Sequence, residues 1–345
     1  MAGKVVTFGE IMLRLSPPNF KRFTQTNSFD LIFGGGEANV AVSLINYGIP
    51  VDYVTKLPNN EIGDACIQFL RQFGVNTSNI VRGGNRIGIY FLEIGSSVRS
   101  SKVLYDREHS AISEANPQDF NWEEIFKGAS WFHLTGITPA ISQNLADICL
   151  EAVKLAKERK LTVSCDLNYR SKLWKYGKTA NEVMSELVKF CDVIIGNEED
   201  AENVLNIKAP DTDITSGIIV ADNYRFVVEE IMKQYPNIKF AAITLRGSIS
   251  ASYNTWSAIL YDGNKLYIGP QYEITPIVDR VGGGDAFMGG LIYGLLTNKE
   301  DLQTALNFAT AASCLKHTII GDFNLVSVDE VLKLMGGDTS GRVSR

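Results

Sequence analysis

The sequence contains few cysteines and few histidines, which argues against several kinds of site. Its 345 residues include five cysteines and three histidines. No two cysteines have Cys-x-x-Cys spacing, so neither a disulfide framework nor a zinc ribbon is expected. The histidines, at positions 109, 133 and 317, are too scattered to form a metal-ligand motif. We therefore expect reduced, buried thiols.

A basic excess and a long apolar run are also missing. Lys and Arg number 33 against 39 Asp and Glu, giving a formal net charge of −6. Proteins dedicated to nucleic acids or anionic membranes carry the opposite excess, so we expect neither partner. No segment reaches the length of about 18 apolar residues that a membrane span needs, and residues 1–9 do not resemble a signal peptide. These features predict a cytoplasmic protein.

Three common catalytic motifs are absent. The sequence has no Gly-x-Gly-x-x-Gly motif, which argues against a dinucleotide-dependent dehydrogenase. It also has no Gly-x-Ser-x-Gly motif, which argues against an α/β-hydrolase. The segment Gly177-Lys178-Thr179 resembles the end of a P-loop, but Lys172 stands where that motif requires glycine.

What the sequence does contain is an alternation of short apolar strands with longer amphipathic segments. This alternation predicts an α/β fold with a mostly parallel central sheet and helices on both faces. The fold would span residues 1–335, followed by a flexible Gly/Ser-rich tail at 336–345. We expect strands at 4–8, 51–57, 131–135, 161–166, 192–195 and 240–245, and helices at 142–159, 180–190, 223–234, 285–296, 302–317 and 328–335.

Two early segments depart from this alternation. The first, at about residues 11–33, lacks helical periodicity. The second, at about 86–110, contains two apolar runs at 87–94 and 102–105 that predict a hairpin. We expect both segments to form a small β insertion that stands off the main sheet.

The strongest local motif is Asp279-Arg280-Val281-Gly282-Gly283-Gly284-Asp285, at the expected start of a helix. Glycine N–H groups can approach a ligand closely, and a helix N-terminus adds unpaired donors and a positive dipole end. Asp285 would then accept a proton from an attacking hydroxyl. The simpler interpretation, a turn followed by a capping Asp285, stays open at this point. A second glycine run, Gly34-Gly35-Gly36 with Asn39, also opens an expected helix.

Together the two glycine elements resemble the two signatures of the ribokinase-like (PfkB) carbohydrate kinases. The first signature is a Gly-Gly turn followed by Asn-x-Ala, here Gly34-Gly35 and Asn39-Val40-Ala41. The second is Asp-Thr-x-Gly-Ala-Gly-Asp, from which this chain departs at Arg280 and Gly283. The resemblance covers about residues 4–335. It implies a Rossmann-like α/β domain with a small β lid over the sugar.

The resemblance also implies an ATP-dependent kinase. Asp285 would be the catalytic base, and the amides of Gly282–Gly284 would form the anion hole for the γ-phosphate. The family motif Asn-x-x-Glu appears as Asn197-Glu198-Glu199-Asp200, so Asn197 and Asp200 would hold Mg²⁺ through water. The residues implied in nucleotide binding are Asn168, Thr244, Arg246, Gly247, Ser248 and Thr310.

Arginines near the expected sugar site favour an acidic sugar, because Arg binds a carboxylate bidentately. Arg107 ends the second lid strand, and Arg170 follows the strand at 161–166, where open α/β sheets place ligands. The pattern resembles that of 2-keto-3-deoxygluconate kinases within the family. It implies substrate contacts by Gly34, Gly35, Asn39, Tyr90, Tyr105, Arg107 and Arg170.

Alternatives stay open for several of these residues. Arg107 could pair with its neighbours Asp106 and Glu108 at the surface, Arg170 could serve ATP phosphates alone, and Tyr90 could be ordinary sheet packing. The sequence predicts phosphorylation of 2-dehydro-3-deoxy-D-gluconate on its terminal hydroxyl. The alternatives are a fructokinase or ribokinase, and a non-catalytic sugar-sensing protein. We also expect a homo-oligomer, because an exposed lid edge invites pairing.

Overall fold

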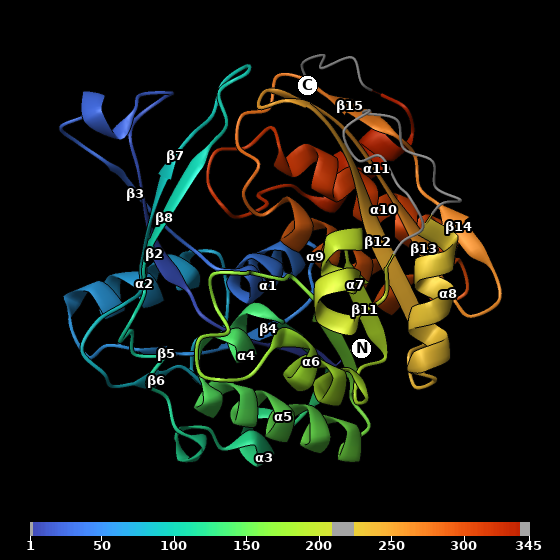
Figure 1. Cartoon of the computed structure of the whole chain (residues 1–345), viewed down its shortest axis with the longest axis horizontal. Coiled ribbons are helices and arrows are strands. Elements are labelled where there is room, and N and C mark those ends of the chain that lie inside the picture. The colour runs from blue at the N-terminus through green and yellow to red at the C-terminus, as the bar shows by residue number, and fades with distance from the viewer. Residues whose placement is uncertain (1–2, 209–223, 339–345) are drawn as a thin grey trace.

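A large sheet forms the centre of the protein (Figure 1). The computed structural model describes residues 3–208 and 224–338; the expected tail beyond Asp338 and the first residue of the helix expected at 223–234 lie outside them. The strands of the sheet are β1 (Lys4–Phe8), β4 (Val51–Val54), β9 (Ala129–Thr135), β10 (Thr162–Asp166), β11 (Val193–Gly196), β12 (Phe240–Ser250), β13 (Tyr253–Tyr261), β14 (Leu266–Ile268) and β15 (Tyr272–Ile274). Their order is β14-β13-β12-β11-β10-β9-β1-β4, with β15 beside β13.

The strands from β12 to β4 run parallel, which confirms the α/β prediction. The other end of the sheet is antiparallel and differs from the prediction. The strand expected at 240–245 continues to Ser250 and pairs with β13, so the segment 244–248 is strand and not loop. Its composition, Arg-Gly-Ser, favours a turn locally, and pairing with β13 overrides that preference.

Helices cover both faces of this sheet. The helices are α1 (Gly36–Asn46), α2 (Glu61–Gln72), α3 (Trp122–Ile125), α4 (Ile137–Ile141), α5 (Gln143–Glu158), α6 (Ala180–Val188), α7 (Glu198–Leu205), α8 (Arg225–Gln234), α9 (Gly283–Thr297), α10 (Leu302–Lys316) and α11 (Val328–Met335). Alternate strand residues face opposite cores. Val6 belongs to the hydrophobic cluster that includes residues of α5, α6 and α8, whereas Val5 belongs to the cluster that includes residues of α1, α2, α9 and α10.

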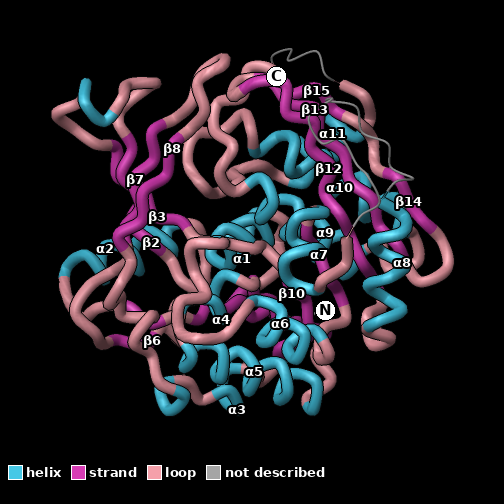
Figure 2. Tube along the Cα trace, viewed as in Figure 1, coloured by secondary structure: helices cyan, strands magenta, loops and turns pink. Residues whose placement is uncertain are grey.

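A smaller sheet stands apart from the main one, as Figure 2 shows. It consists of β2 (Met12–Ser16), β3 (Asp30–Gly34), β7 (Ile89–Glu93) and β8 (Lys102–Asp106), in the order β3-β2-β7-β8. All four strands lie in or within one residue of the two segments that depart from the alternation. A further pair, β5 (Lys56–Leu57) and β6 (Val81–Arg82), forms a separate two-stranded parallel sheet.

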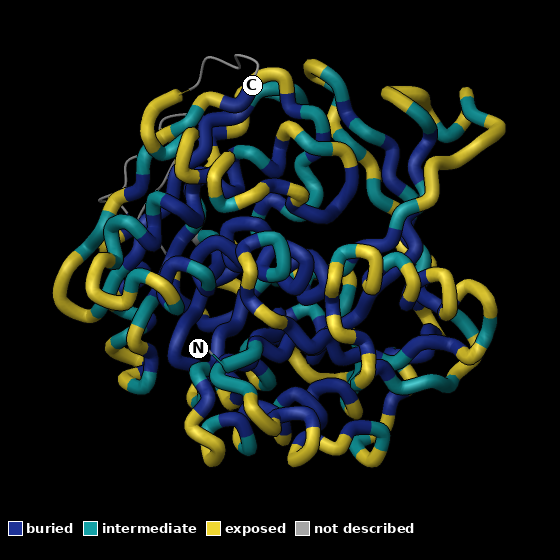
Figure 3. The backbone as a smooth tube through the Cα atoms, turned by 180° about the vertical axis from the view of Figure 1, so that it is seen from behind, coloured by how far each residue is buried: buried dark blue, intermediate teal, exposed yellow. Residues whose placement is uncertain are grey.

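Close packing of α9 sets the position of its N-terminus. A Cβ on Gly289 would lie 2.6 Å from Cβ of Ser43 in α1, and one on Gly294 would lie 2.7 Å from Cα of Ala305 in α10. Such spacing requires glycine, since real Cβ atoms do not approach so closely. The two helices that begin at the glycine motifs therefore lie against each other, and most of their residues are buried. Figure 3 shows the buried segments gathered in the middle of the molecule.

All five cysteines are free and buried, as expected. Within the described residues, no helix combines the length and the apolar character that crossing a membrane requires.

Candidate active site

A cavity of about 460 Å³ lies between the small sheet and the carboxyl ends of the parallel strands. This size suits a small-molecule ligand, and the carboxyl edge of an open α/β sheet is where such ligands bind. Residues from both glycine motifs meet in it. The cavity is lined by the expected residues Gly34, Gly35, Asn39, Tyr90, Tyr105, Arg107, Asn168, Arg170, Asn197, Asp200, Thr244, Arg246, Gly282, Gly283, Gly284 and Asp285.

Three of the residues expected to bind nucleotide do not line this cavity. Gly247 and Ser248 pair with β13 in the extended part of β12. Thr310 is fully buried in α10, where its hydroxyl donates to the carbonyl of Leu306 at 2.8 Å. The structure therefore does not bring these three to the site.

The structure also adds polar residues that the sequence analysis did not assign: Glu10, Glu37, Asp166, Arg280 and Asp322. Glu10 closely follows β1 and Asp166 ends β10. Their positions at strand ends could have identified them as candidate site residues from the sequence. Glu37 accepts hydrogen bonds from the Thr135 amide and hydroxyl at 3.0 and 2.9 Å, which anchors α1 to the end of β9. Asp322 lies in a loop without a local sequence signal.

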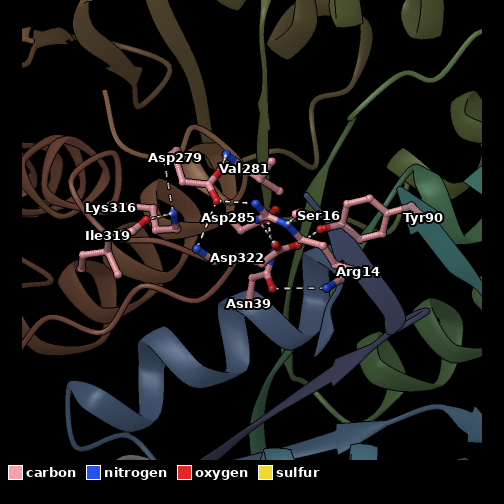
Figure 4. A network of polar contacts seen from close by, with 12 residues as sticks. Arg14, Ser16, Asn39, Tyr90, Asp279, Val281, Asp285, Lys316, Ile319 and Asp322 are labelled. Atoms are coloured by element: carbon pink, nitrogen blue, oxygen red, sulfur yellow. Dashed lines mark hydrogen bonds and ion pairs between the residues drawn. The ribbon is translucent and has the colours of Figure 1, made fainter. Parts of the chain in front are cut away.

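Asn39 joins the two glycine motifs through Asp285 (Figure 4). The Gly35 N–H donates to Oδ1 of Asn39 at 3.2 Å, which leaves the amide nitrogen to face Asp285. Nδ2 of Asn39 then donates to Oδ2 of Asp285 at 2.7 Å. Burial raises the pKa of Asp285 to about 6, although the Asn39 hydrogen bond opposes that rise. The carboxylate is thus held in one orientation with a pKa close to neutrality.

The α9 helix begins at Gly283, so Asp285 occupies its first turn and is not its N-cap. Gly282 is the N-cap, with a φ of 83°, and the first intrahelical bond runs from the Ala286 N–H to the Gly282 carbonyl at 2.8 Å. The preceding N–H groups have no intrahelical acceptor, as at any helix start. The Gly283 N–H has a long contact of 3.4 Å with the Arg280 carbonyl, and a helix start of this kind can receive an anion.

Gly282 requires glycine for two independent reasons. Its φ is left-handed, and an added Cβ would lie 2.1 Å from the Asp322 carbonyl oxygen. We expect Gly282→Ala to lower the free energy of unfolding by more than about 2 kcal/mol in urea titrations. At Gly284 the nearest atom to an added Cβ is 3.9 Å away, so Gly284→Ala is the matched control and should change stability by less than about 1 kcal/mol. Equal losses in the two variants would contradict this account of the turn.

Acidic groups crowd the part of the cavity next to Asp285. Burial raises the pKa of Asp166 well above its usual value, and the nearby Asp200 and Asp285 raise it further, while Arg170 opposes them. Asn197 and Asp200 form a reciprocal capping box at the start of α7, with bonds of 2.8 and 2.9 Å. Both expected magnesium residues therefore also have a structural task.

The side-chain oxygens in this part of the cavity are of the kind that bind a hydrated Mg²⁺. Oδ1 of Asn168 is buried without a hydrogen-bond partner, and Asn168 lines the cavity beside Asp166. Mg²⁺ prefers carboxylate and carbonyl oxygens and keeps several waters. Direct ligation by three or more side chains is not what the structure offers, because the described residues contain no such His, Cys, Asp or Glu cluster.

Arg107 has a different partner from those expected. Its guanidinium forms a buried ion pair with Glu10, and Ser110 donates to the other Glu10 oxygen at 2.8 Å. Surface pairing of Arg107 with Asp106 is therefore wrong: Asp106 pairs with Arg86 at 2.7 Å. Nε of Arg107 is buried without a hydrogen-bond partner, and Arg107 lines the cavity.

A buried network ties the small sheet to the second glycine motif (Figure 4). Arg14 in β2 donates to Asp279 at 2.6 Å and to Asp322 at 2.8 Å. The Tyr90 hydroxyl in β7 donates to the other Asp322 oxygen at 2.5 Å, so Tyr90 does more than pack in the sheet. At the hairpin tip, Ser97 accepts a hydrogen bond from the Ala251 N–H at 2.8 Å. These contacts hold the small sheet over the cavity.

Comparisons with known proteins agree with this architecture. A family model described as pfkB family carbohydrate kinase matches residues 2–324. The chain is 32% identical over 341 residues to a 2-dehydro-3-deoxygalactonokinase of Haloferax volcanii, with 99% of each chain covered. It is 53% identical to the crystal structure of a 2-dehydro-3-deoxygluconokinase from Thermotoga maritima, with a TM-score of 0.92 over 97% of this chain and 100% of that one. A putative 2-keto-3-deoxygluconate kinase from Enterococcus faecalis is 27% identical, with a TM-score of 0.89 over 100% and 99% of the two chains. The chain thus belongs to the pfkB family of carbohydrate kinases and has the ribokinase-like fold that its glycine motifs predict.

Proposed function

We propose that this protein transfers the γ-phosphoryl group of ATP to the terminal hydroxyl of 2-dehydro-3-deoxy-D-gluconate. The observation that carries the proposal is the juxtaposition of the Asp285 carboxylate, held by Asn39, with the N–H groups at the start of α9, which have no intrahelical acceptor. The names of the Haloferax and Thermotoga relatives support a 2-keto-3-deoxy sugar acid as the acceptor.

Asp285 would act as the general base. With a pKa of about 6 it is ionised at neutral pH, yet it is a stronger base than an ordinary aspartate. The substrate hydroxyl loses its proton to Asp285 as its oxygen bonds to the γ-phosphorus. The bond between the γ-phosphorus and the bridging oxygen breaks, and ADP leaves. Amides at the start of α9 receive the charge on the transferring group.

Mg²⁺, when bound, neutralises charge on the β- and γ-phosphates. Asp166, Asn168, Asn197 and Asp200 line the cavity together, and their oxygens would hold the ion directly or through water. The charge of Arg170 opposes the rise that burial causes in the pKa values of Asp166, Asp200 and Asp285, and it can also attract phosphate.

The small-sheet side of the cavity would select an acidic sugar. Glu10 fixes one edge of the Arg107 guanidinium, and Tyr105 lies under it with the ring centre 5.6 Å from Cζ. A guanidinium oriented in this way at the cavity can bind a second carboxylate. A neutral ketose would offer it no such partner.

Coupled ADP-release assays on the sugar acid, its galacto epimer, fructose and ribose test the proposal. We expect turnover with the sugar acids, and we expect Arg107→Ala to raise their KM by about 10-fold or more, since hydrogen bonds to charged groups contribute about 1.5–3 kcal/mol. Arg86→Ala, which removes a surface arginine beside the same strand, is the control and should change KM little. Preference for fructose or ribose that survives Arg107→Ala would favour a neutral-sugar kinase. Sugar binding without any ADP release would favour a sensor.

A further inference from the structure

One buried charge has no part in the mechanism above. Lys316 ends α10 and is fully buried. It is not among the residues that line the cavity. Its ammonium donates to two backbone carbonyls, those of Ile319 at 3.1 Å and Asp279 at 3.4 Å (Figure 4). A charged lysine inside a protein is rare unless it has a specific task.

The partners of this ammonium are unusual because they are carbonyls. Among the described residues, no carboxylate lies within ion-pair distance of Nζ of Lys316. The carboxylate of Asp279, whose charge favours the charged form of Lys316, is bound instead by Arg14 and by the N–H groups of Val281 and Gly321. An ammonium held by main-chain oxygens resembles the way proteins bind a free monovalent cation.

The position of Lys316 places this charge directly behind the proposed anion hole. Asp279 begins the glycine motif, and its carbonyl is one of the two acceptors. Cε of Lys316 lies 3.3 Å from where a Cβ on Gly282 would be. The other acceptor, Ile319, lies in the loop that continues to Asp322. The ammonium thus joins both backbone segments that frame the start of α9.

Burial of this lysine carries an energetic penalty. Burial lowers its pKa, while Asp279, Asp322 and Asp285 counteract that effect by favouring the charged form. An apolar side chain of similar length would avoid the penalty, so the charge itself calls for an explanation. A positive charge close to a developing negative charge in a water-poor site stabilises it strongly.

We propose that Lys316 is a positioning residue whose ammonium serves as a built-in monovalent cation, holding the Asp279 and Ile319 carbonyls and maintaining positive potential behind the amides of Gly282–Gly284. This inference rests on the proposed function, because the anion hole is part of it. It assigns Lys316 an effect on the transition state and little effect on sugar binding.

The test compares Lys316→Ala, which opens space at the carbonyls, with Lys316→Met, which keeps the apolar stem. We expect both to lower kcat by about 100-fold, the size seen when one donor of an oxyanion hole is removed, with KM for the sugar acid changed less than about 3-fold. Adding K⁺ or NH₄⁺ at about 0.1 M should raise the kcat of Lys316→Ala at least about 10-fold. Tetramethylammonium at the same ionic strength should not raise it. Lys316→Met should recover less, because its side chain fills the space. Leu315→Ala, on the same turn of α10, is the control for cavity formation and should show no ion-specific recovery.

The outcomes separate this inference from the function on which it rests. An inactive unaltered protein contradicts the proposed function. An active protein whose folded Lys316 variants keep their kcat, or lose it without ion-specific recovery, contradicts only the role of Lys316. If neither variant folds, the unaltered protein decides: equal activity in K⁺ and tetramethylammonium salts supports a built-in cation, and a requirement for K⁺ overturns it.

Discussion

Asp285→Asn is expected to reduce kcat by about 10³-fold while leaving the fold intact, because a positioned general base contributes about 10²–10⁴-fold. Asparagine has the same shape and can still accept the Asn39 hydrogen bond, but it cannot take a proton at neutral pH. Single-turnover kinetics with saturating ATP and sugar acid measure the loss. Asp64→Asn, at an exposed aspartate of α2, is the control and should retain full activity.

The same variant should be more stable than the unaltered protein above pH 6. The folded-state pKa of Asp285, about 6, exceeds the usual aspartate value of about 3.9, so the folded state binds this proton more tightly. Ionised Asp285 therefore costs the fold on the order of 3 kcal/mol at pH 7, and this cost disappears as pH falls from 6 to 4. Urea titrations at pH 7.5 and 4.5 should show a stability gain from Asp285→Asn that is about 3 kcal/mol at the higher pH and falls to about 1 kcal/mol at the lower one. Lost activity together with lost stability at pH 7.5 would contradict a buried, ionised base.

In the unaltered protein, kcat/KM should fall about tenfold per pH unit below pH 6 and level off above pH 7. Protonation of Asp285 removes the base from the free enzyme, which this parameter reports.

The largest effect on stability is expected for Arg14→Met, a loss of about 3–5 kcal/mol of unfolding free energy. Arg14 is completely buried, and its removal leaves the carboxylates of Asp279 and Asp322 without their cationic partner in the protein interior. Because Asp279 begins the glycine motif, we also expect lower activity. Urea unfolding followed by fluorescence measures the change.

Arg86→Met is the matched control for that prediction. It breaks the Arg86–Asp106 pair, which has the same chemistry but lies at the surface of the small sheet, and it should cost less than about 1 kcal/mol. Arg14→Lys should fall between the two, since it keeps the charge but cannot bridge two carboxylates. Similar losses for Arg14→Met and Arg86→Met would show that the network does not anchor the small sheet.

Local patterns in the sequence were sufficient for the body of the fold. The β-branched run at 4–8 and the glycines before Asp285 carry their own signals, because strand formation and a left-handed turn depend on nearby residues. The extension of β12 to Ser250 was not predictable in this way, since the paired strand β13 imposes it.

The residues missed at the site are those whose partners are distant in sequence. Arg14 and Asp322 are separated by 308 positions, and the sequence around each residue does not indicate that the two form a pair. Arg107 was expected to reach a carboxylate, but the Glu10 carboxylate comes from a segment 97 positions away. Buried charge pairs of this kind arise only when the small sheet folds onto the body, so a single sequence cannot indicate them.

Phosphorus NMR of the reaction product tests the central proposal most directly. Incubation of the unaltered protein with ATP, Mg²⁺ and 2-dehydro-3-deoxy-D-gluconate should produce ADP together with one phosphomonoester. Its ³¹P signal should be a triplet, split by the two protons of the terminal CH₂–O group, and Asp285→Asn should not form it at a comparable rate. Absence of the ester, its formation on a CH–O carbon, or its undiminished formation by Asp285→Asn would contradict the account.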